Sequence, residues 1–436
     1  MHILYNILLL IAALFAIPYY ACKMIFTGKY RKSLGPKFGF IKPEIFEEMQ
    51  GSPRIWIHAV SVGEVTAAAP VLASLRRHFP EACIILSTST ETGQEMARRI
   101  VTSATSFIYY PLDIPWVVKK VINQVRPDIF ILTETELWPN FIKTCTEKGV
   151  KILMVNGRIS PRSFKKYAMT GFFWKGILSS ISEMGVISEI DAERLKALGM
   201  PASRVHVMGN AKYDSLAAKA SPEIRKDMEG KLNLTKNDKV FIAGSTHDGE
   251  EKIVLNVYGN IIQKYNDFKL IIVPRHPERG QAVIALVREA GFDDYITMSE
   301  INSGRHRTDE RVIIIDVIGE LFKAYSLATV VFCGGSLVPK GGQNILEPAA
   351  WGKVVFYGPF MEDFRDEKVL LEKTGAGIMI QSAVELRDDL LGLLSNPHAI
   401  AMRGKNGREM VIANMGAADR YAEMIRSHLI ARNPKN

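Results

Sequence analysis

Apolar and polar positions alternate along this chain in a way that predicts parallel β-sheets covered by helices. Short runs of consecutive apolar residues, typical of buried strands, are separated by longer stretches with apolar residues at helical spacing. Before residue 215 the predicted strands are 55–60, 83–86, 129–132, 152–155, 185–188 and 205–207. After a polar helical stretch at 214–238 they are 240–243, 270–273, 312–315, 330–332 and 354–357. The repeated order of strand, helix and strand predicts two α/β domains with parallel sheets.

The domain boundary is predicted near Ser215, where the strand pattern weakens and then restarts. We therefore predict one Rossmann-like domain over 23–215 and a second over 216–436, with the last helix, 417–431, free to pack back on the first. Neither half has G-x-G-x-x-G directly after a strand, so the fingerprint of an NAD site is missing. Ligands of open parallel sheets bind beyond the carboxyl ends of the strands. We expect the two domains to face each other across a ligand-binding cleft.

The N-terminal segment from Ile3 to Cys22 contains no charged residue. At about 20 residues it is long enough to cross a bilayer. Basic residues without any acidic one follow: Lys23, Lys29, Arg31, Lys32, Lys37 and Lys42. Positive charge marks the cytoplasmic side of a membrane segment. We predict that residues 1–22 form a single-pass anchor in the inner membrane with the domains in the cytoplasm. The alternatives are a helix lying in the membrane surface and a helix docked in a groove of the protein.

The formal net charge of +9 favours an anionic partner, which could be a nucleic acid, a phospholipid surface or a phosphorylated substrate. The basic residues cluster beside the N-terminal apolar segment, and no nucleic-acid-binding motif is evident, so we expect no nucleic acid partner. The chain has four cysteines that lie far apart without a C-x-x-C pair. This spacing argues against a disulfide framework and a structural zinc site.

Three candidate catalytic groups lie in the first half, and each also has a structural explanation. Glu64 follows the strand 55–60, where a carboxylate can act as a general base, although glutamate is also favoured at a helix start. Glu134 and Glu136 invite a metal interpretation, but Glu-x-Glu without histidine is a poor metal signal, and helix capping before Pro139 is the alternative. Lys212 could neutralise developing charge or be a solvated surface lysine. We predict no metal site.

The second half contains two loops suited to a nucleotide. Arg275 lies in the proline-rich loop 274–279, and a guanidinium binds phosphate oxygens in a bidentate manner. Glycines at 334–335 and 341–342 allow a backbone to approach a ligand, and the helix that follows offers N–H groups to a phosphate. Glu347 could accept hydrogen bonds from ribose hydroxyls. A plain tight turn is the alternative for the glycine-rich stretch.

Four motifs resemble those of the bacterial 3-deoxy-D-manno-octulosonic acid (Kdo) transferases. They are His-Ala-Val-Ser-Val-Gly-Glu at 58–64, Glu-Thr-Glu-Leu-Trp-Pro at 134–139, Pro-Arg-His-Pro-Glu-Arg at 274–279 and Gly-Gly-Gln-Asn-Ile-Leu-Glu-Pro at 341–348. The resemblance implies an inverting glycosyltransferase of the GT-B type, with Glu64 as proton acceptor and Glu134 and Lys212 assisting the transition state. It also implies that CMP is held by Pro274, Arg275, Ile318, Gly319, Glu320, Asn344, Ile345, Leu346 and Glu347. Ile318 is the weakest of these matches.

The same resemblance implies the substrates. CMP-Kdo would be the donor, and a phosphorylated acyl disaccharide, the tetraacyl lipid A precursor, would be the acceptor at an anionic membrane surface. It implies neither a cofactor nor a metal. A UDP-sugar transferase or a UDP-sugar 2-epimerase could share the two-domain fold, although an epimerase needs no anchor. A nucleotide-sugar-binding membrane scaffold without catalysis is a further alternative, but the presence of Glu64 together with the whole donor loop argues against it.

Overall fold

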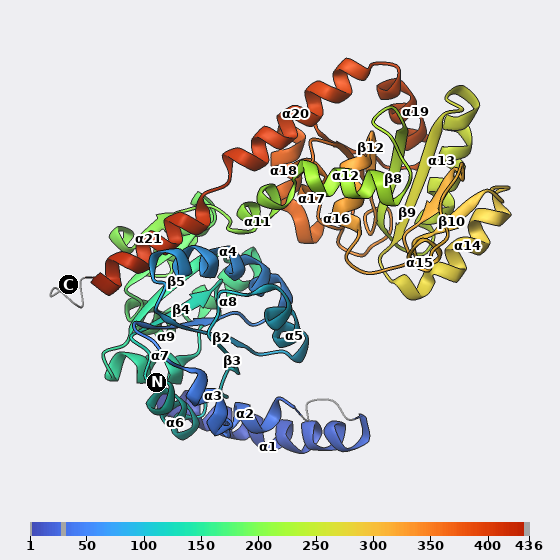
Figure 1. The fold of residues 1–436 in the computed structure, drawn as a ribbon. Helices are drawn as coiled ribbons and strands as arrows, with labels where there is room; N and C mark the ends of the chain where they lie inside the picture. The colour runs from blue at the N-terminus through green and yellow to red at the C-terminus, as the bar shows by residue number, and fades with distance from the viewer. Residues whose placement is uncertain (1, 28–31, 431–436) are drawn as a thin grey trace. The chain divides into compact units, whose positions relative to one another are not determined.

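The computed structural model describes residues 2–27 and 32–430, which form two compact units (Figure 1). The division between the units falls after Ser215, inside helix α11, and again before Met415. The last described helix, α21 (Ala417–Ile430), therefore belongs to the first unit. Residue 431 of the predicted last helix, and Lys29 and Arg31 of the predicted basic run, lie outside the described residues.

The first unit is built on a seven-stranded sheet in the order β3-β2-β1-β4-β5-β6-β7. All neighbouring strands are parallel. The strands are β1 (Arg54–His58), β2 (Cys83–Thr88), β3 (Ser106–Tyr109), β4 (Ile129–Thr133), β5 (Lys151–Gly157), β6 (Glu183–Val186) and β7 (Val205–Val207). The helices are α1 (His2–Thr27), α2 (Leu34–Lys37), α3 (Pro43–Glu48), α4 (Val62–His78), α5 (Glu91–Ile100), α6 (Pro115–Val125), α7 (Pro139–Glu147), α8 (Pro161–Met169), α9 (Gly171–Ser179), α10 (Glu189–Ala197), η1 (Ala202–Arg204), α11 (Lys212–Lys219) and α21.

The second unit has its own seven-stranded parallel sheet, in the order β10-β11-β9-β8-β12-β13-β14. Its strands are β8 (Lys239–Thr246), β9 (Phe268–Pro274), β10 (Tyr295–Thr297), β11 (Val312–Ile314), β12 (Val330–Cys333), β13 (Val354–Tyr357) and β14 (Gly377–Met379). Its helices are α12 (Pro222–Lys231), α13 (Glu250–Lys264), η2 (Pro277–Arg279), α14 (Gly280–Glu289), α15 (Met298–Asn302), α16 (Leu321–Ala324), η3 (Tyr325–Leu327), α17 (Leu346–Ala350), η4 (Glu362–Phe364), α18 (Arg365–Lys373), α19 (Ala383–Leu394) and α20 (Pro397–Ala413).

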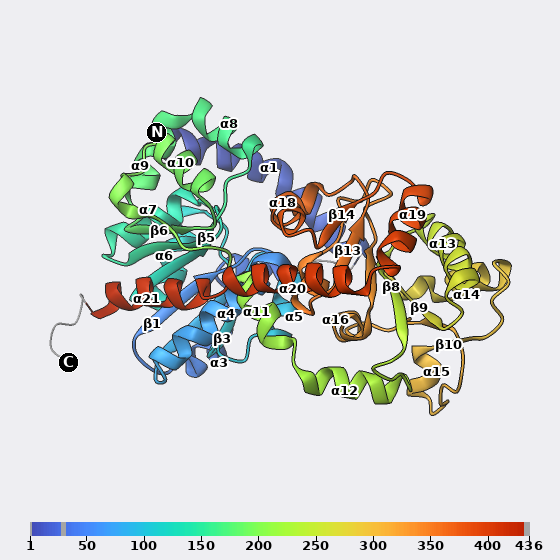
Figure 2. The same ribbon diagram turned by 90° about the horizontal axis from the view of Figure 1, so that it is seen from above.

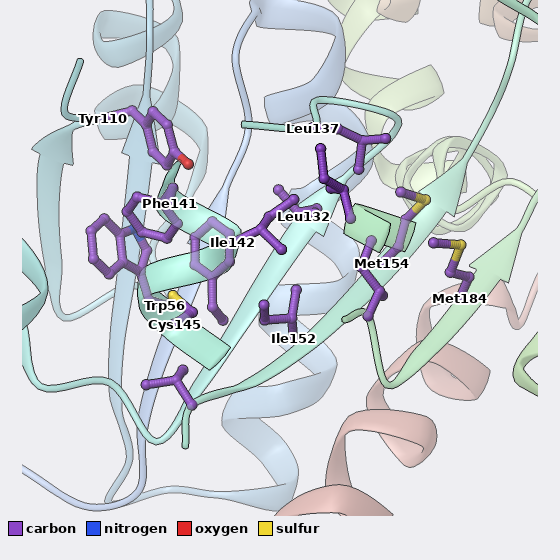
Figure 3. Packing of buried hydrophobic residues seen from close by; sticks show 14 of the residues in the cluster. Trp56, Tyr110, Leu132, Leu137, Phe141, Ile142, Cys145, Ile152, Met154 and Met184 are labelled. Carbon is purple, nitrogen blue, oxygen red and sulfur yellow. The ribbon is translucent and has the colours of Figure 1, made fainter. Parts of the chain in front are cut away.

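Both sheets are covered by helices on their two faces, as Figure 2 shows for each unit. Strand β1 shows why the strand residues 55–57 are all apolar. Ile55 and Ile57 point into one buried cluster of the first unit, while Trp56 points into the cluster on the other face. Trp56, Tyr110 and Phe141 gather in this second cluster (Figure 3), with the Trp56 and Phe141 ring centroids 5.1 Å apart.

Helix α21 completes the first unit although it comes from the end of the chain. It packs on α4, and Tyr421 and Ile425 are buried in the same cluster as Ile55. The Asp214 carboxylate caps the helix, because its Oδ1 accepts from Gly416 N and its Oδ2 accepts from Ala418 N at 3.0 Å. The tyrosine hydroxyl of this helix donates to Gly209 O at 2.7 Å. Residues from 209 to 214 are therefore tied to the C-terminal helix.

Helix α1 lies against the first unit through one face (Figure 1). Tyr5 donates its hydroxyl to Asp113 Oδ2 at 2.9 Å, and Asn140 Nδ2 donates to Asn6 Oδ1 at 2.7 Å. Leu9 packs against the cluster that contains Trp56. Apolar residues away from these contacts are exposed: Ile3, Leu4, Ile7, Leu8, Leu10, Ile11, Leu14 and Phe15. Within 2–27 and 32–430, no helix combines the length and apolar character needed to cross a bilayer.

Candidate functional site

The strand order of the first sheet reverses between β1 and β4, which pair in parallel. Loops that follow two such strands diverge to opposite sides of the sheet and leave a crevice at its carboxyl edge. Glu64 follows β1 and Glu134 follows β4, so the two predicted catalytic carboxylates come from the two sides of this switch point.

Glu64 lies in the first turn of α4 and is buried, with 8% of its surface exposed. Its Oε2 accepts from Val60 N at 2.8 Å, and its Oε1 accepts from Ser61 Oγ at 3.2 Å. Burial raises the pKa of the Glu64 carboxyl to about 7. The negative charges of Glu134 and Glu136 raise this pKa further, while the two hydrogen bonds oppose the shift. A carboxyl group that titrates near neutral pH is well suited to accept a proton in a reaction.

Glu134 occupies a backbone conformation that glutamate rarely adopts, with φ at 61°. The loop holds it there because its N–H donates to Val155 O, on the neighbouring strand β5, at 3.0 Å. Lys212 Nζ lies 3.9 Å from Glu134 Oε1 and forms an ion pair with it. Strain of this kind is tolerated where the surrounding structure fixes it, and it concentrates at functional sites.

Two asparagines that the sequence analysis did not predict as site residues hold the backbone at Lys212. Asn156, at φ 53° near the end of β5, is buried and accepts from Ala211 N through its Oδ1 at 3.0 Å. Asn210 Oδ1 accepts from Lys212 N at 3.0 Å. In the sequence, the signal for this arrangement was Asn156, an asparagine directly after the predicted strand 152–155. The structure thus brings Glu64, Glu134 and Lys212 into one cluster, and their roles stay predictions.

Glu136 lies in the same cluster, and burial raises the pKa of its carboxyl, with a further contribution from Glu134. His58, from the motif that contains Glu64, is fully buried and stacks on Tyr110 with ring centroids 3.8 Å apart. Burial lowers the pKa of His58 to about 3, so the imidazole is neutral at physiological pH. Over the described ranges, no group of three or more His, Cys, Asp or Glu residues could hold a metal ion.

The second sheet reverses its strand order between β8 and β12. The predicted nucleotide-binding residues lie at the end of β9 or in the loops after β9, β11 and β12, at the carboxyl edge of this sheet. Pro274 is the buried last residue of β9, and the exposed Arg275 donates its backbone N–H to Thr246 O at 2.9 Å. Ile345 and Leu346 are buried.

Three of the other predicted donor residues, Asn344, Glu347 and Glu320, already contact protein groups. Asn344 Nδ2 donates to Glu347 Oε1 at 3.2 Å, and Asn344 Oδ1 accepts from Leu346 N at 3.1 Å. Glu320 Oε1 lies 3.5 Å from Lys231 Nζ. Gly319 has φ at 93°, and Ile318 beside it is 74% exposed. An exposed apolar side chain beside a glycine in the left-handed region is consistent with a backbone contact to a ligand.

The glycine-rich loop after β12 differs from the expected phosphate cradle. A Cβ at Gly334 would lie 2.5 Å from Ser245 O, so this glycine makes room for the protein backbone and not for a ligand. The N–H groups of Gly335, Ser336 and Leu337 donate to Glu250, the first residue of α13. These donors are therefore already satisfied by a side chain that the sequence analysis missed.

Glu251, next to Glu250, is also fully buried and was also missed. Its Oε1 accepts from Thr246 Oγ1 at 3.0 Å and pairs with Arg279 Nη1 at 2.5 Å. The arginine at the end of the motif 274–279 thus fastens its loop to α13. Adjacent acidic residues at a helix start look like ordinary dipole-favoured positions, which is why neither was recognised.

Comparisons with known proteins identify relatives of this chain. Residues 32–215 match the family model described as 3-deoxy-D-manno-octulosonic-acid transferase (kdotransferase). The chain is 32% identical to the 3-deoxy-D-manno-octulosonic acid transferase of Haemophilus influenzae, over 98% of each chain. It is 29% identical to that of Chlamydia pneumoniae, over 98% of this chain and 96% of the relative.

Among solved structures, the UDP-GlcNAc 2-epimerase of Neisseria meningitidis matches with a TM-score of 0.58 and 15% identity. The match covers 87% of this chain and 100% of the epimerase. At this identity the likeness concerns the fold alone, and the fold is of the GT-B type, with two parallel α/β domains.

Proposed function

This chain belongs to the 3-deoxy-D-manno-octulosonic acid (Kdo) transferase family, and we propose that it transfers Kdo from CMP-Kdo to the tetraacyl lipid A precursor. The observation that carries the proposal is the environment of Glu64. A buried carboxyl whose pKa is raised to about 7 lies beside an ion pair, Glu134–Lys212, at the switch point of a parallel sheet. The proposed donor residues lie at the corresponding edge of the second sheet.

In the proposed reaction, Glu64 accepts the proton of a glucosamine hydroxyl on the lipid. The hydroxyl oxygen forms a bond to the anomeric carbon of Kdo, and the bond from that carbon to the phosphate oxygen breaks. CMP leaves with the electron pair, and attack from the opposite face inverts the anomeric centre. Lys212 and the Arg275 guanidinium supply positive charge while negative charge develops on the phosphate. Glu134 holds Lys212 in place by their ion pair.

Donor binding is proposed at the carboxyl edge of the second sheet. Arg275 would contact the phosphate, and the segments 318–320 and 344–347 would contact the cytidine and its ribose. Glu320 and Glu347 are the carboxylates suited to ribose hydroxyls. The proposal needs no metal, because the nucleoside monophosphate leaving group can be stabilised by these cationic side chains.

We propose that helix α1 attaches the enzyme to the inner membrane, on its cytoplasmic side. A single-pass helix with the domains in the cytoplasm would carry Tyr5 and Asn6 to the far side of the bilayer. Both residues instead contact Asp113 and Asn140 of the first unit. These contacts favour a helix that lies along the unit, with its exposed apolar residues in the near leaflet.

A second exposed apolar element supports this membrane surface. Met169 of α8 and Phe172 of α9 are exposed, and Tyr5 packs against Phe173 with ring centroids 6.0 Å apart. Lys165 and Lys166 on α8 add positive charge, which attracts anionic lipid. The lipid acceptor would reach Glu64 from this surface.

The experiment that tests the function uses the full chain with CMP-Kdo and the tetraacyl lipid A precursor. Mass spectrometry of the lipid product should show the mass of the acceptor increased by one or more Kdo residues. CMP-N-acetylneuraminic acid, a second nucleotide-activated sugar acid, serves as the control donor. Absence of a Kdo-containing lipid, with CMP-Kdo still intact, would refute the proposal.

A further inference from the structure

Glu250 binds two loops of the second unit at once. Its Oε1 accepts from Ser336 N at 3.0 Å and from Leu337 N at 2.9 Å. Its Oε2 accepts from Gly335 N at 2.7 Å and from His247 N at 2.9 Å. The side chain is fully buried, with 0% exposed. One carboxylate thus receives four backbone N–H groups from the loops that follow β8 and β12.

These two loops meet at the switch point of the second sheet, where an open parallel sheet binds its ligand. Three successive N–H groups that converge on one point form a concave site typical of phosphate binding. Here the anion in that site is the carboxylate of Glu250, a part of the protein. The glycine-rich loop is therefore shaped before any ligand arrives.

We propose that Glu250 is a positioning residue for the donor, which holds the loops 245–249 and 334–337 in the shape that binds the nucleotide. The inference rests on the proposed function, since it concerns the donor site of that reaction. Glu250 itself does not contact the donor. Because it occupies the backbone N–H groups of 335–337, side chains at the rims of the loops bind the acidic groups of the donor.

His247 and Arg275 are the side chains placed for this role. His247 belongs to the loop that Glu250 fixes, and its ring lies 5.9 Å from that of His276, centroid to centroid. Among the described residues, buried Nε2 of His247 has no hydrogen-bond partner. A Cβ at Gly335 would lie 3.3 Å from the His247 ring, so the glycine-rich loop and the histidine pack directly on each other. A change in the loop would therefore move the histidine.

The test replaces Glu250 by glutamine, which has the same shape but turns an NH2 group toward two of the four N–H donors. We expect the Kd for CMP, measured by calorimetry, and the KM for CMP-Kdo to rise about tenfold or more, which corresponds to about 1.4 kcal/mol. The KM for the lipid acceptor should stay unchanged. Amides 335–337 should exchange hydrogen faster in mass-spectrometric measurements.

The matched control is Glu289→Gln, which alters an exposed carboxylate paired with Lys252. This control should change none of these quantities.

Two outcomes would overturn the proposal. One is wild-type affinity for CMP in Glu250→Gln, and the other is unchanged exchange of the loop amides. Where the glutamine variant does not fold, Glu250→Asp provides the same measurements, because its shorter side chain keeps the charge but cannot reach both loops. Failure of the wild-type protein to transfer Kdo would refute the proposed function instead, and the exchange measurement would still decide whether Glu250 shapes the loop.

Discussion

Lys212 Nζ lies 3.9 Å from Glu134 Oε1, and this ion pair joins the loop after β4 to the first residue of α11. The pair lies beside Glu64, whose pKa responds to the charge of Glu134. Glu134 holds the positive charge of Lys212 next to Glu64, whose pKa is about 7. This arrangement suits the activation of a hydroxyl and the stabilisation of the charge that develops.

Replacement of Glu64 by glutamine should reduce the rate of Kdo transfer by about 10²–10⁴-fold, because the amide cannot accept the proton. Binding of CMP, measured by calorimetry, should remain at the wild-type level, since Glu64 lies in the first unit and the proposed donor residues lie in the second. Glu95→Gln, a change in the helix α5 of the same unit, is the control. Near-normal turnover of Glu64→Gln would remove this residue from the mechanism.

The rate of transfer should rise with pH and level off above about 7, because only the ionised form of Glu64 accepts a proton. The effect on stability has the opposite sign. The folded pKa is raised from 4.5, so ionisation of Glu64 lowers the free energy of unfolding as the pH increases from about 4.5 to about 7. In Glu134→Gln one of the raising charges is gone, and the midpoint of the pH–rate profile should move to lower pH. An unchanged midpoint would show that Glu134 does not act on Glu64.

Treatment with EDTA should leave the rate of transfer largely intact. The proposed mechanism stabilises the leaving phosphate with Arg275 and Lys212, so no divalent cation is required. The measurement compares rates before and after chelation, and again after addition of magnesium or manganese. Loss of activity that either metal restores would make Glu134 and Glu136 candidate ligands.

Removal of residues 1–22 should give a folded protein that still binds CMP but floats with liposomes only partly and in a salt-sensitive way. The apolar residues of α1 are lost, whereas the basic residues beyond them remain, each contributing about 1 kcal/mol at an anionic surface. Circular dichroism checks the fold. Unfolding of the truncated protein would mean that α1 is a part of the core.

The contacts of α1 can be tested separately with Tyr5→Phe, which removes only the hydroxyl bonded to Asp113. If the helix lies along the first unit, a cysteine introduced at Ile3 should be protected from a membrane-impermeant reagent added on the periplasmic side. A cysteine introduced at the exposed Met169 on α8, in the same unit, serves as the reference position. Labelling of residue 3 from the periplasm would establish a spanning helix.

Asp214→Ala should lower the free energy of unfolding by about 0.5–2 kcal/mol, the usual cost of losing an N-terminal helix cap. The carboxylate accepts from two N–H groups at the start of α21. Asp214→Asn, which keeps one acceptor oxygen, should lose less. Denaturant unfolding measures both variants, and equal stability of Asp214→Ala and the wild-type protein would contradict the capping role.

Much of the fold was predictable because its central strands are apolar on both faces. The strands that the sequence analysis did not predict, β3, β10 and β14, all lie at the edges of the sheets and have only three or four residues. An edge strand is covered less completely, so its sequence carries a weaker apolar signal. The polar stretch 214–238 gave two helices, α11 and α12, as its pattern suggested.

The residues of the candidate site were also predictable only in part. Glu64, Glu134 and Lys212 were recognised from loops after predicted strands and from short motifs. Glu250 was missed because its partner Gly335 lies 85 residues away in the sequence, and no local pattern predicts that contact. The backbone conformations of Glu134 and Asn156 were also beyond prediction, since a positive φ at a residue other than glycine is imposed by tertiary contacts.

Helix α21 has a consequence for how the chain is made. The second unit is continuous from Leu216 to Asn414, whereas the first unit includes a helix that follows the second unit in the sequence. During synthesis on the ribosome, part of the apolar cluster of the first unit stays exposed until Tyr421 and Ile425 are made. The whole second unit is synthesised in that interval. The first unit to begin folding is thus the last to be completed. We expect a truncated polypeptide that lacks α21 to leave the apolar cluster of the first unit incomplete.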